Sequence, residues 1–83
     1  METKIRVRGV DHWLTTEQVL EATFRKDPDR ALLPGGFYAV VRRKRVPVKW
    51  AIRRALDLPG TDFTTDQALG TMKRLGFHVG QQD

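Results

Sequence analysis

Seven basic residues lie close together in the stretch VRRKRVPVKWAIRRAL, which spans residues 41–56. They are Arg42, Arg43, Lys44, Arg45, Lys49, Arg53 and Arg54. Arginine pairs bidentately with phosphate groups and with guanine edges, and lysine binds phosphate as a compact point charge. The chemistry that these side chains offer is therefore the binding of a polyanion. The alternative is a basic surface that only keeps the protein in solution.

The excess positive charge of the chain is confined to one block. The 83 residues carry a net charge of +5, from 15 basic and 10 acidic residues. Residues 30–56, beginning with Arg30, hold eight basic residues and no acidic residue. Residues 1–29 hold five basic and six acidic residues, and residues 57–83 hold two and four. A single basic stripe of this kind is typical of a nucleic-acid-binding domain.

Residues that could carry out catalysis are scarce. The chain has no serine and no cysteine, so threonine alone remains among the common hydroxyl and thiol nucleophiles. His12 and His78 are far apart in the sequence, and the acidic residues stand in turns and caps rather than in a ligand cluster. We therefore expect a protein that is not an enzyme and that uses no metal and no cofactor.

Length and composition indicate one domain over residues 1–83 and no membrane span. No apolar run approaches the length that a transmembrane helix needs, and METKIRVRG lacks the apolar core of a signal peptide. Because the chain has no cysteine, no disulfide can stabilise the fold. The expected location is the cytoplasm.

The hydrophobic pattern predicts the elements that position the basic residues. Strands are expected over residues 4–10 and 77–80, and a β-hairpin over residues 37–48 whose second strand is cut short by a proline. Helices are expected over residues 15–26, 49–58 and 64–75, the first and third beginning in capping boxes. The order β-α-β-β-α-α-β predicts an α+β domain, with a small antiparallel or mixed sheet and helices packed on one side.

The capping and turn residues define the ends of the outer helices. Thr15 with Gln18 forms the first expected capping box, and Thr64 with Gln67 forms the second. Gly76 suits the position that follows the third helix. On the first helix, residues 19, 20, 23 and 24 fall on one face, which places Phe24 among the residues that pack inward.

The expected helix over residues 49–58 divides the basic stretch into two faces. Its apolar face consists of Ala51, Ile52, Ala55, Leu56 and Leu58. Trp50 falls on the other face among the basic residues, where an exposed indole would stack on a base or wedge into a groove. The alternative is that Trp50 covers part of the core. Trp13, which stands just before a helix cap, is expected in the core or in a hydrophobic staple.

The tip of the expected hairpin, residues 42–45, consists of four adjacent cations. They repel one another, and a tight two-residue turn prefers glycine or asparagine at positive φ. An arginine pair in such a turn therefore lowers its stability, and contact with a phosphate backbone would compensate. A basic β-ribbon or loop tip can lie along or within a nucleic-acid groove.

Residues 38–80 resemble a family of small bacterial proteins. The pattern is Tyr-x-Val-Val, a turn, Lys/Arg-x-Pro-x-Lys, an apolar helix, Asp-Phe-Thr-Thr-x-Gln-Ala and a closing Leu-Gly-Phe-x-Val. A related Tyr-Pro-Pro-Lys-type module resembles the N-terminal region of modification-dependent HNH restriction endonucleases. The resemblance extends over roughly residues 14–80 and makes Tyr38, Pro47, Lys49 and residues 75–77 family positions. It implies association with nucleic acid or restriction-type systems, and no catalytic residues, because the nuclease domain is absent.

One departure from the family pattern concerns the hairpin turn. The family commonly has Asn-Gly or Asp-Gly there, whereas this chain has Arg42-Arg43. The departure puts a tight turn in doubt and makes the basic tip particular to this protein.

The sequence therefore predicts a non-enzymatic nucleic-acid-binding domain, and it favours DNA over RNA as the partner without deciding between them. The predicted contact residues are Arg42, Arg43, Lys44, Arg45, Lys49, Trp50, Arg53 and Arg54. The alternative is a protein-interaction module or small regulator that docks its basic face on an acidic protein partner.

Overall fold

The computed structural model describes residues 1–28 and 32–83, so Arg30 of the basic block lies outside the described residues. The chain forms a single α+β domain with principal extents of 32 × 22 × 21 Å. The described residues form three helices and five strands in the order β-β-α-β-β-α-α-β. The expected fold class is confirmed, and the order contains one strand more than expected.

The additional strand makes an N-terminal hairpin. β1 (Glu2–Val7) pairs antiparallel with β2 (Val10–Thr15), where the sequence pattern suggested a strand followed directly by the approach to a helix. The connection is the two-residue turn Arg8-Gly9, with φ of 52° and 78°, both positive as in a type I′ turn. Because Thr15 is the N-cap, the residues before it are free to pair with β1 rather than to extend the helix.

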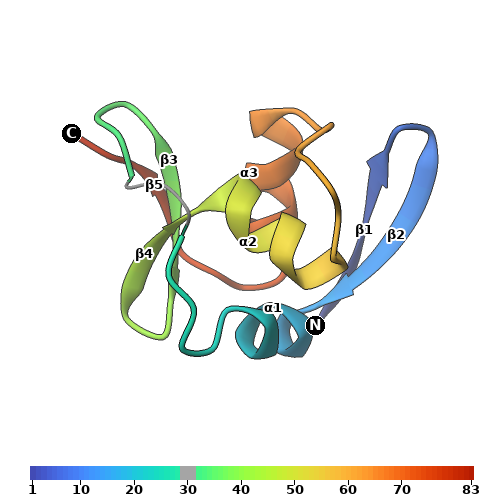
Figure 1. Cartoon of the computed structure of the whole chain (residues 1–83), viewed down its shortest axis with the longest axis horizontal. Coiled ribbons are helices and arrows are strands. Elements are labelled where there is room, and N and C mark those ends of the chain that lie inside the picture. The colour runs from blue at the N-terminus through green and yellow to red at the C-terminus, as the bar shows by residue number, and fades with distance from the viewer. Residues whose placement is uncertain (29–31) are drawn as a thin grey trace.

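A second sheet lies at the other end of the molecule (Figure 1). β3 (Phe37–Val41) is its central strand, flanked by β4 (Lys44–Pro47) and β5 (Val79–Gln81), and both pairings are antiparallel. Gly80 permits the close approach of β5, because a Cβ there would lie 2.5 Å from the Tyr38 hydroxyl. The strands thus form two small antiparallel sheets instead of the single sheet that we expected.

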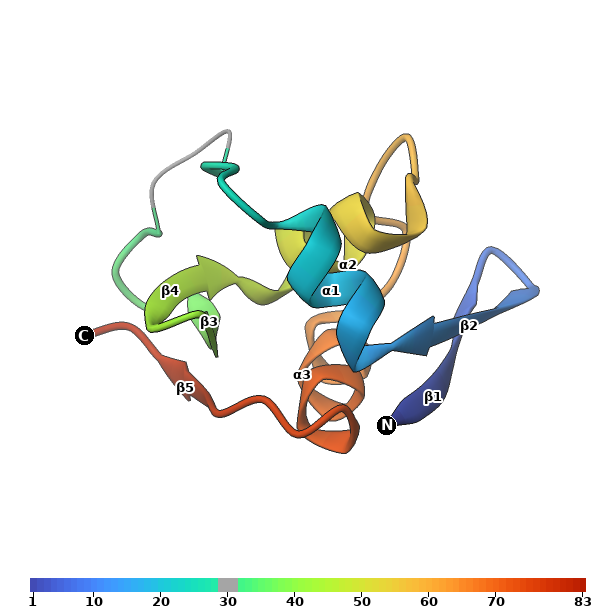
Figure 2. The same ribbon diagram turned by 90° about the horizontal axis from the view of Figure 1, so that it is seen from below.

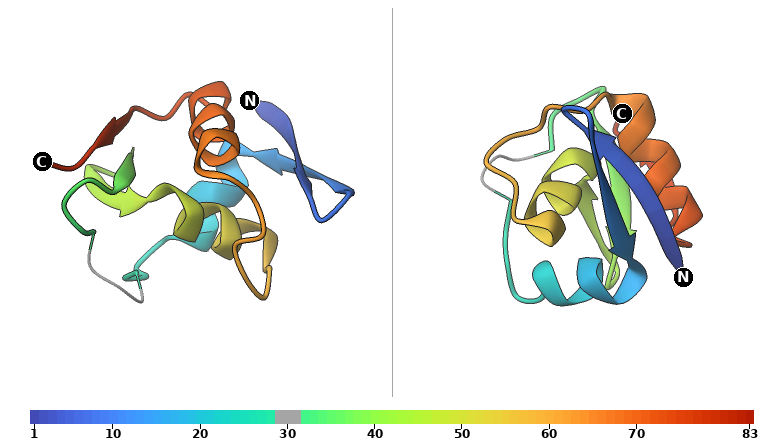
Figure 3. Two further views of the ribbon diagram at one scale, coloured as in Figure 1. Left: turned by 90° about the horizontal axis from the view of Figure 1, so that it is seen from above. Right: turned by 90° about the vertical axis from the view of Figure 1, so that its right-hand side faces the viewer.

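Three helices fill the space between the two sheets (Figures 1–3). α2 (Val48–Leu56) contacts α1 (Thr16–Ala22), α3 (Thr65–Arg74) and strands of both sheets. The largest fully buried side chains come from several elements; they are Leu14, Val19, Ile52, Thr71, Met72 and Leu75. Because α2 is covered from several directions, it buries more than the one stripe of residues that a surface helix buries.

Both expected capping boxes are confirmed. The Thr15 hydroxyl accepts a hydrogen bond from the Gln18 amide at 3.1 Å, and the Gln18 side chain accepts one from the Thr15 amide at 2.8 Å. Thr64 and Gln67 make the same two hydrogen bonds with the same lengths. Gly76 follows α3 with φ of 90°, as expected of a residue that ends a helix.

Helix α1 is shorter than expected, and this changes the position of Phe24. The helix ends at Ala22; the Thr23 hydroxyl donates to the Val19 carbonyl at 2.7 Å, and Arg25 has φ of 56°. Since Phe24 follows the helix rather than lying on its inner face, the residue is 49% exposed. The expectation that it packs inward with the helix is wrong.

Candidate nucleic-acid interface

The Arg42-Arg43 pair forms the two-residue turn of the β3–β4 hairpin. The φ angles are 51° and 69°, so both arginines are left-handed, as in a type I′ turn. The tight turn that the arginine pair put in doubt is therefore present. A left-handed conformation costs an L-residue other than glycine about 1 kcal/mol or more, so the turn is strained where an Asn-Gly pair would be relaxed.

The tip of this hairpin extends beyond the rest of its sheet. β5 pairs with residues 37–39 of β3, and the last backbone bond across this edge runs from the Val40 amide to the His78 carbonyl at 2.8 Å. Beyond Val40 the hairpin is a two-stranded ribbon. All four residues of the tip, 42–45, are exposed.

Two cations of the tip face α1 and the segment that follows it. The Lys44 ammonium lies 3.2 Å from a carboxylate oxygen of Asp27. The Arg42 guanidinium donates to the Leu20 carbonyl at 3.3 Å, and its central carbon lies 4.9 Å from the centre of the Phe24 ring. Because an aromatic ring and a carbonyl hold this arginine, its position is restricted before any ligand binds.

The other two cations of the tip point elsewhere. Arg45 follows Lys44 in the strand and so faces the opposite side of the sheet. There its guanidinium carbon lies 4.4 Å from the centre of the Tyr38 ring and one of its nitrogens donates to the Gln82 side chain at 3.0 Å. The Arg43 side chain makes no hydrogen bond or ion pair with the part of the chain that the structure describes. The tip thus presents positive charge at its end and on both faces.

A cleft of about 240 Å³ separates the hairpin tip from the end of α1. We call it the basic cleft; it is lined by Thr23, Phe24, Arg25, Lys26, Val41, Arg42, Lys44 and Val46. Sequence reasoning missed Arg25 and Lys26, because the acidic residues of 1–29 balance their charge along the chain. The only local sign of a basic site was that the two residues are adjacent and precede a loop that contains proline. The fold brings them next to the hairpin tip.

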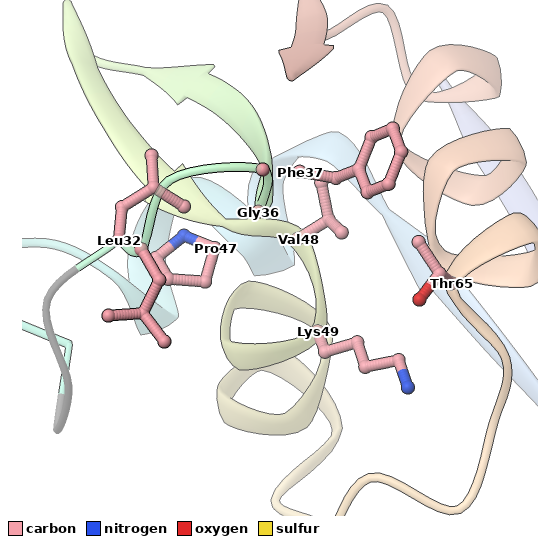
Figure 4. Close-up of a pocket in the computed structure, with 9 residues that line it drawn as sticks. Leu32, Gly36, Phe37, Pro47, Val48, Lys49 and Thr65 are labelled. Atoms are coloured by element: carbon pink, nitrogen blue, oxygen red, sulfur yellow. The ribbon is translucent and has the colours of Figure 1, made fainter. Parts of the chain in front are cut away.

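The other predicted basic contact residues, Lys49, Arg53 and Arg54, lie on α2. The helix begins at the end of β4 opposite the tip and runs away from that sheet toward β1 and β2 (Figure 1). Arg54 is exposed and Arg53 half-buried. Lys49 lines a mainly apolar groove of about 450 Å³ together with Phe37, Pro47 and Thr65 (Figure 4). The hairpin tip and the start of α2 lie at opposite ends of β4, and their use together as one basic face stays a prediction.

The two tryptophans lie in environments opposite to those expected: Trp50 is buried and Trp13 is exposed. Trp50 is 7% exposed and belongs to the core, because other elements cover the side of α2 on which it lies. Its proposed stacking on bases is wrong, and the core alternative is confirmed. Trp13 is 61% exposed, because strand alternation turns Leu14 inward and Trp13 outward. The expected core position of Trp13 is wrong.

The exposed Trp13 lies on a surface with balanced charge. It stands opposite Lys4 in the hairpin register, with the ammonium 5.9 Å from the ring centre. Asp11 lies 3.6 Å from the Lys4 ammonium and 4.0 Å from the Arg6 guanidinium. The outer face of the N-terminal hairpin is therefore less attractive to a polyanion than the hairpin tip of the other sheet.

Within residues 1–28 and 32–83, no three His, Asp or Glu side chains gather as the ligands of a metal ion would. None of the described helices is long and apolar enough to cross a membrane. Comparison of the chain with protein-family models, with curated proteins and with solved structures gave no match. The family resemblance of residues 38–80 therefore stays a prediction, and the case for a function depends on the geometry of the basic residues.

Proposed function

We propose that this protein is a nucleic-acid-binding domain, without catalytic activity, that holds the phosphate backbone with the tip of the β3–β4 hairpin. The observation that carries the proposal is the left-handed Arg42-Arg43 turn. The fold would be more stable with asparagine and glycine in these positions. Strain of this kind occurs where side chains serve a function, and here it places two guanidinium groups at the projecting end of a ribbon.

The arrangement of charge supports a polyanion as the ligand. Four exposed cations occur at one hairpin end, with Arg25 and Lys26 beside them, and Asp27 is the only acidic residue that pairs with this group among the described residues. Exposed cations gain most from a ligand whose condensed counterions are released on binding, as happens with nucleic acid. Arg42 and Arg45 are already held against aromatic rings, which lowers the entropy lost when they bind phosphate.

The experiment is an anisotropy titration of labelled oligonucleotides with the wild-type protein and two double variants. Arg43→Ala with Arg45→Ala removes two cations from the hairpin tip. Arg54→Ala with Lys73→Ala removes the same charge from α2 and α3, neither of which lines the basic cleft. Alanine at position 43 keeps a strained left-handed residue, so this change removes charge alone, whereas Arg45→Ala also removes the contact with the Tyr38 ring and the hydrogen bond to Gln82.

We expect the tip variant to bind at least tenfold more weakly and the control variant to bind within about threefold of wild type, given about 1 kcal/mol for each lost phosphate contact. DNA and RNA oligonucleotides of one sequence are compared, with DNA the expected partner. Equal losses in both variants, or no binding by the wild type at low salt, would refute the proposal.

A second candidate function is protein binding, and Trp13 is the observation that favours it. A tryptophan that is 61% exposed on a ribbon with balanced charge resembles an interface residue more than a phosphate-binding one. A pull-down from lysate with and without nuclease distinguishes the two functions. A protein that survives nuclease treatment and is lost on Trp13→Ala supports this candidate; material lost with nuclease supports nucleic-acid binding.

A further inference from the structure

The basic cleft combines cations with an exposed aromatic ring. The guanidinium carbons of Arg25 and Arg42 lie 5.2 Å and 4.9 Å from the centre of the Phe24 ring. Phe24 as a whole residue is nevertheless 49% exposed. Arginine and phenylalanine from two separate segments thus form one cluster, and a nucleobase can stack on an aromatic ring or on a guanidinium group.

The cleft also contains cations that the fold leaves available. Arg25 is left-handed like the two arginines of the turn, with φ of 56°. Lys44 is paired with Asp27, whereas Arg25 and Lys26 make no ion pair with the described residues. Two available cations from the end of α1 therefore stand beside the stacking cluster, where they can hold a phosphate group.

Acidic residues border the other side of the cluster. Glu17 and Glu21 line a neighbouring depression together with Phe24 and Arg42. Their carboxylates repel a phosphate on that side and leave the side of Arg25 as the favourable one. The cluster therefore attracts an anion on the side of Arg25 and repels one on the side of the two glutamates.

We propose that the basic cleft binds one unpaired nucleotide of a single strand, with the base stacked on Phe24 and Arg42 and the phosphate held by Arg25 and Lys26. The inference rests on the proposed function and adds its substrate class. A base inside a duplex is stacked on both faces, so it cannot reach the Phe24 ring without leaving the helix. The cleft, with a volume of about 240 Å³, has room for a single nucleotide but not for a duplex.

The test compares a single-stranded DNA octamer with the duplex of the same sequence, for wild type, Phe24→Leu and Arg25→Gly. Leucine keeps the apolar contact but removes the stacking ring. Glycine suits the left-handed conformation at position 25 and so keeps the fold while it removes a cation. Trp13→Leu is the matched control, because it removes an exposed aromatic ring that lies outside the cleft.

We expect wild type to prefer the single strand, and Phe24→Leu to weaken single-strand binding about 5- to 100-fold with little effect on the duplex, as found for the loss of one base-stacking ring. Arg25→Gly should weaken single-strand binding about five- to tenfold, and Trp13→Leu should leave it unchanged. An unchanged affinity in Phe24→Leu, or equal losses on both ligands, would overturn the inference.

The two proposals fail in different ways. If Arg43→Ala with Arg45→Ala weakens binding while Phe24→Leu and Arg25→Gly do not, the hairpin tip binds nucleic acid and the nucleotide site is wrong. If the wild type binds neither ligand at low salt, the proposed function itself is wrong.

Discussion

At the scale of single residues, the β3–β4 turn contains arginines in a backbone conformation that favours glycine. Arg42 and Arg43 both have positive φ, and the other hairpin turn has the glycine, Gly9, that such geometry favours. Folding alone gives no reason for a second arginine in place of glycine. The side chain of Arg43 lies at the exposed end of the ribbon, where its charge rather than its packing can be used.

Arg43→Gly should therefore change stability and binding in opposite directions. Removing the left-handed strain should stabilise the protein by about 0.5–1 kcal/mol and raise Tm by about 2–8 °C. Affinity for nucleic acid should fall about fivefold, because one phosphate contact is lost. Circular dichroism melting and anisotropy measure the two effects. Arg43→Lys, which keeps strain and charge, is the control; a Tm that falls in the glycine variant would contradict the assignment of strain.

The two tryptophans make a matched pair for stability. Trp50 is buried and Trp13 is exposed. Trp50→Ala should lower the free energy of unfolding by about 3–5 kcal/mol, a large part of the total for a domain of this size. Trp13→Ala should change it by no more than about 0.5 kcal/mol. Urea denaturation gives both values, and similar losses in the two variants would contradict the placement of the rings.

At the scale of elements, the sequence predicted where helices begin better than where they end or which faces are buried. Thr15 and Thr64 begin their helices as expected, because a capping box depends on residues only three positions apart. Phe24 and Trp13 were misplaced, because their exposure depends on where α1 ends and on the pairing of β2 with β1. The same holds for Trp50. The helical periodicity predicted on which side of α2 it lies, but its burial depends on the elements that pack against that side.

The two caps should contribute measurably to stability. Thr64→Ala removes the acceptor of the 3.1 Å bond from the Gln67 amide and should lower the free energy of unfolding by about 1 kcal/mol. Thr64→Ser keeps an oxygen in place and should lose much less. Urea denaturation of the two variants measures the difference, and equal stabilities would show that the cap contributes little.

At the scale of the whole molecule, the two hairpins lie at opposite ends and differ in charge. The β3–β4 tip and the basic cleft gather unbalanced cations at one end, whereas Asp11 and Asp62 pair with cations of the N-terminal hairpin. The sequence located most of the cations of the first surface from their density along the chain. It could not find Arg25 and Lys26, because their place beside the hairpin tip depends on which segments the fold brings together.

The salt dependence of affinity tests the account most directly, because its slope counts phosphate contacts whereas affinity alone also reflects net charge. The slope of log K against log salt is measured for a single strand with wild type, Arg43→Ala/Arg45→Ala and Arg54→Ala/Lys73→Ala. We expect a wild-type slope of about −3 to −4, for four to six contacts at about −0.7 each. The tip variant should lower its magnitude by about 1.4, since two contacts are lost, and the control should keep it. Equal slopes in all three proteins would contradict the claim that the hairpin tip holds the phosphate backbone.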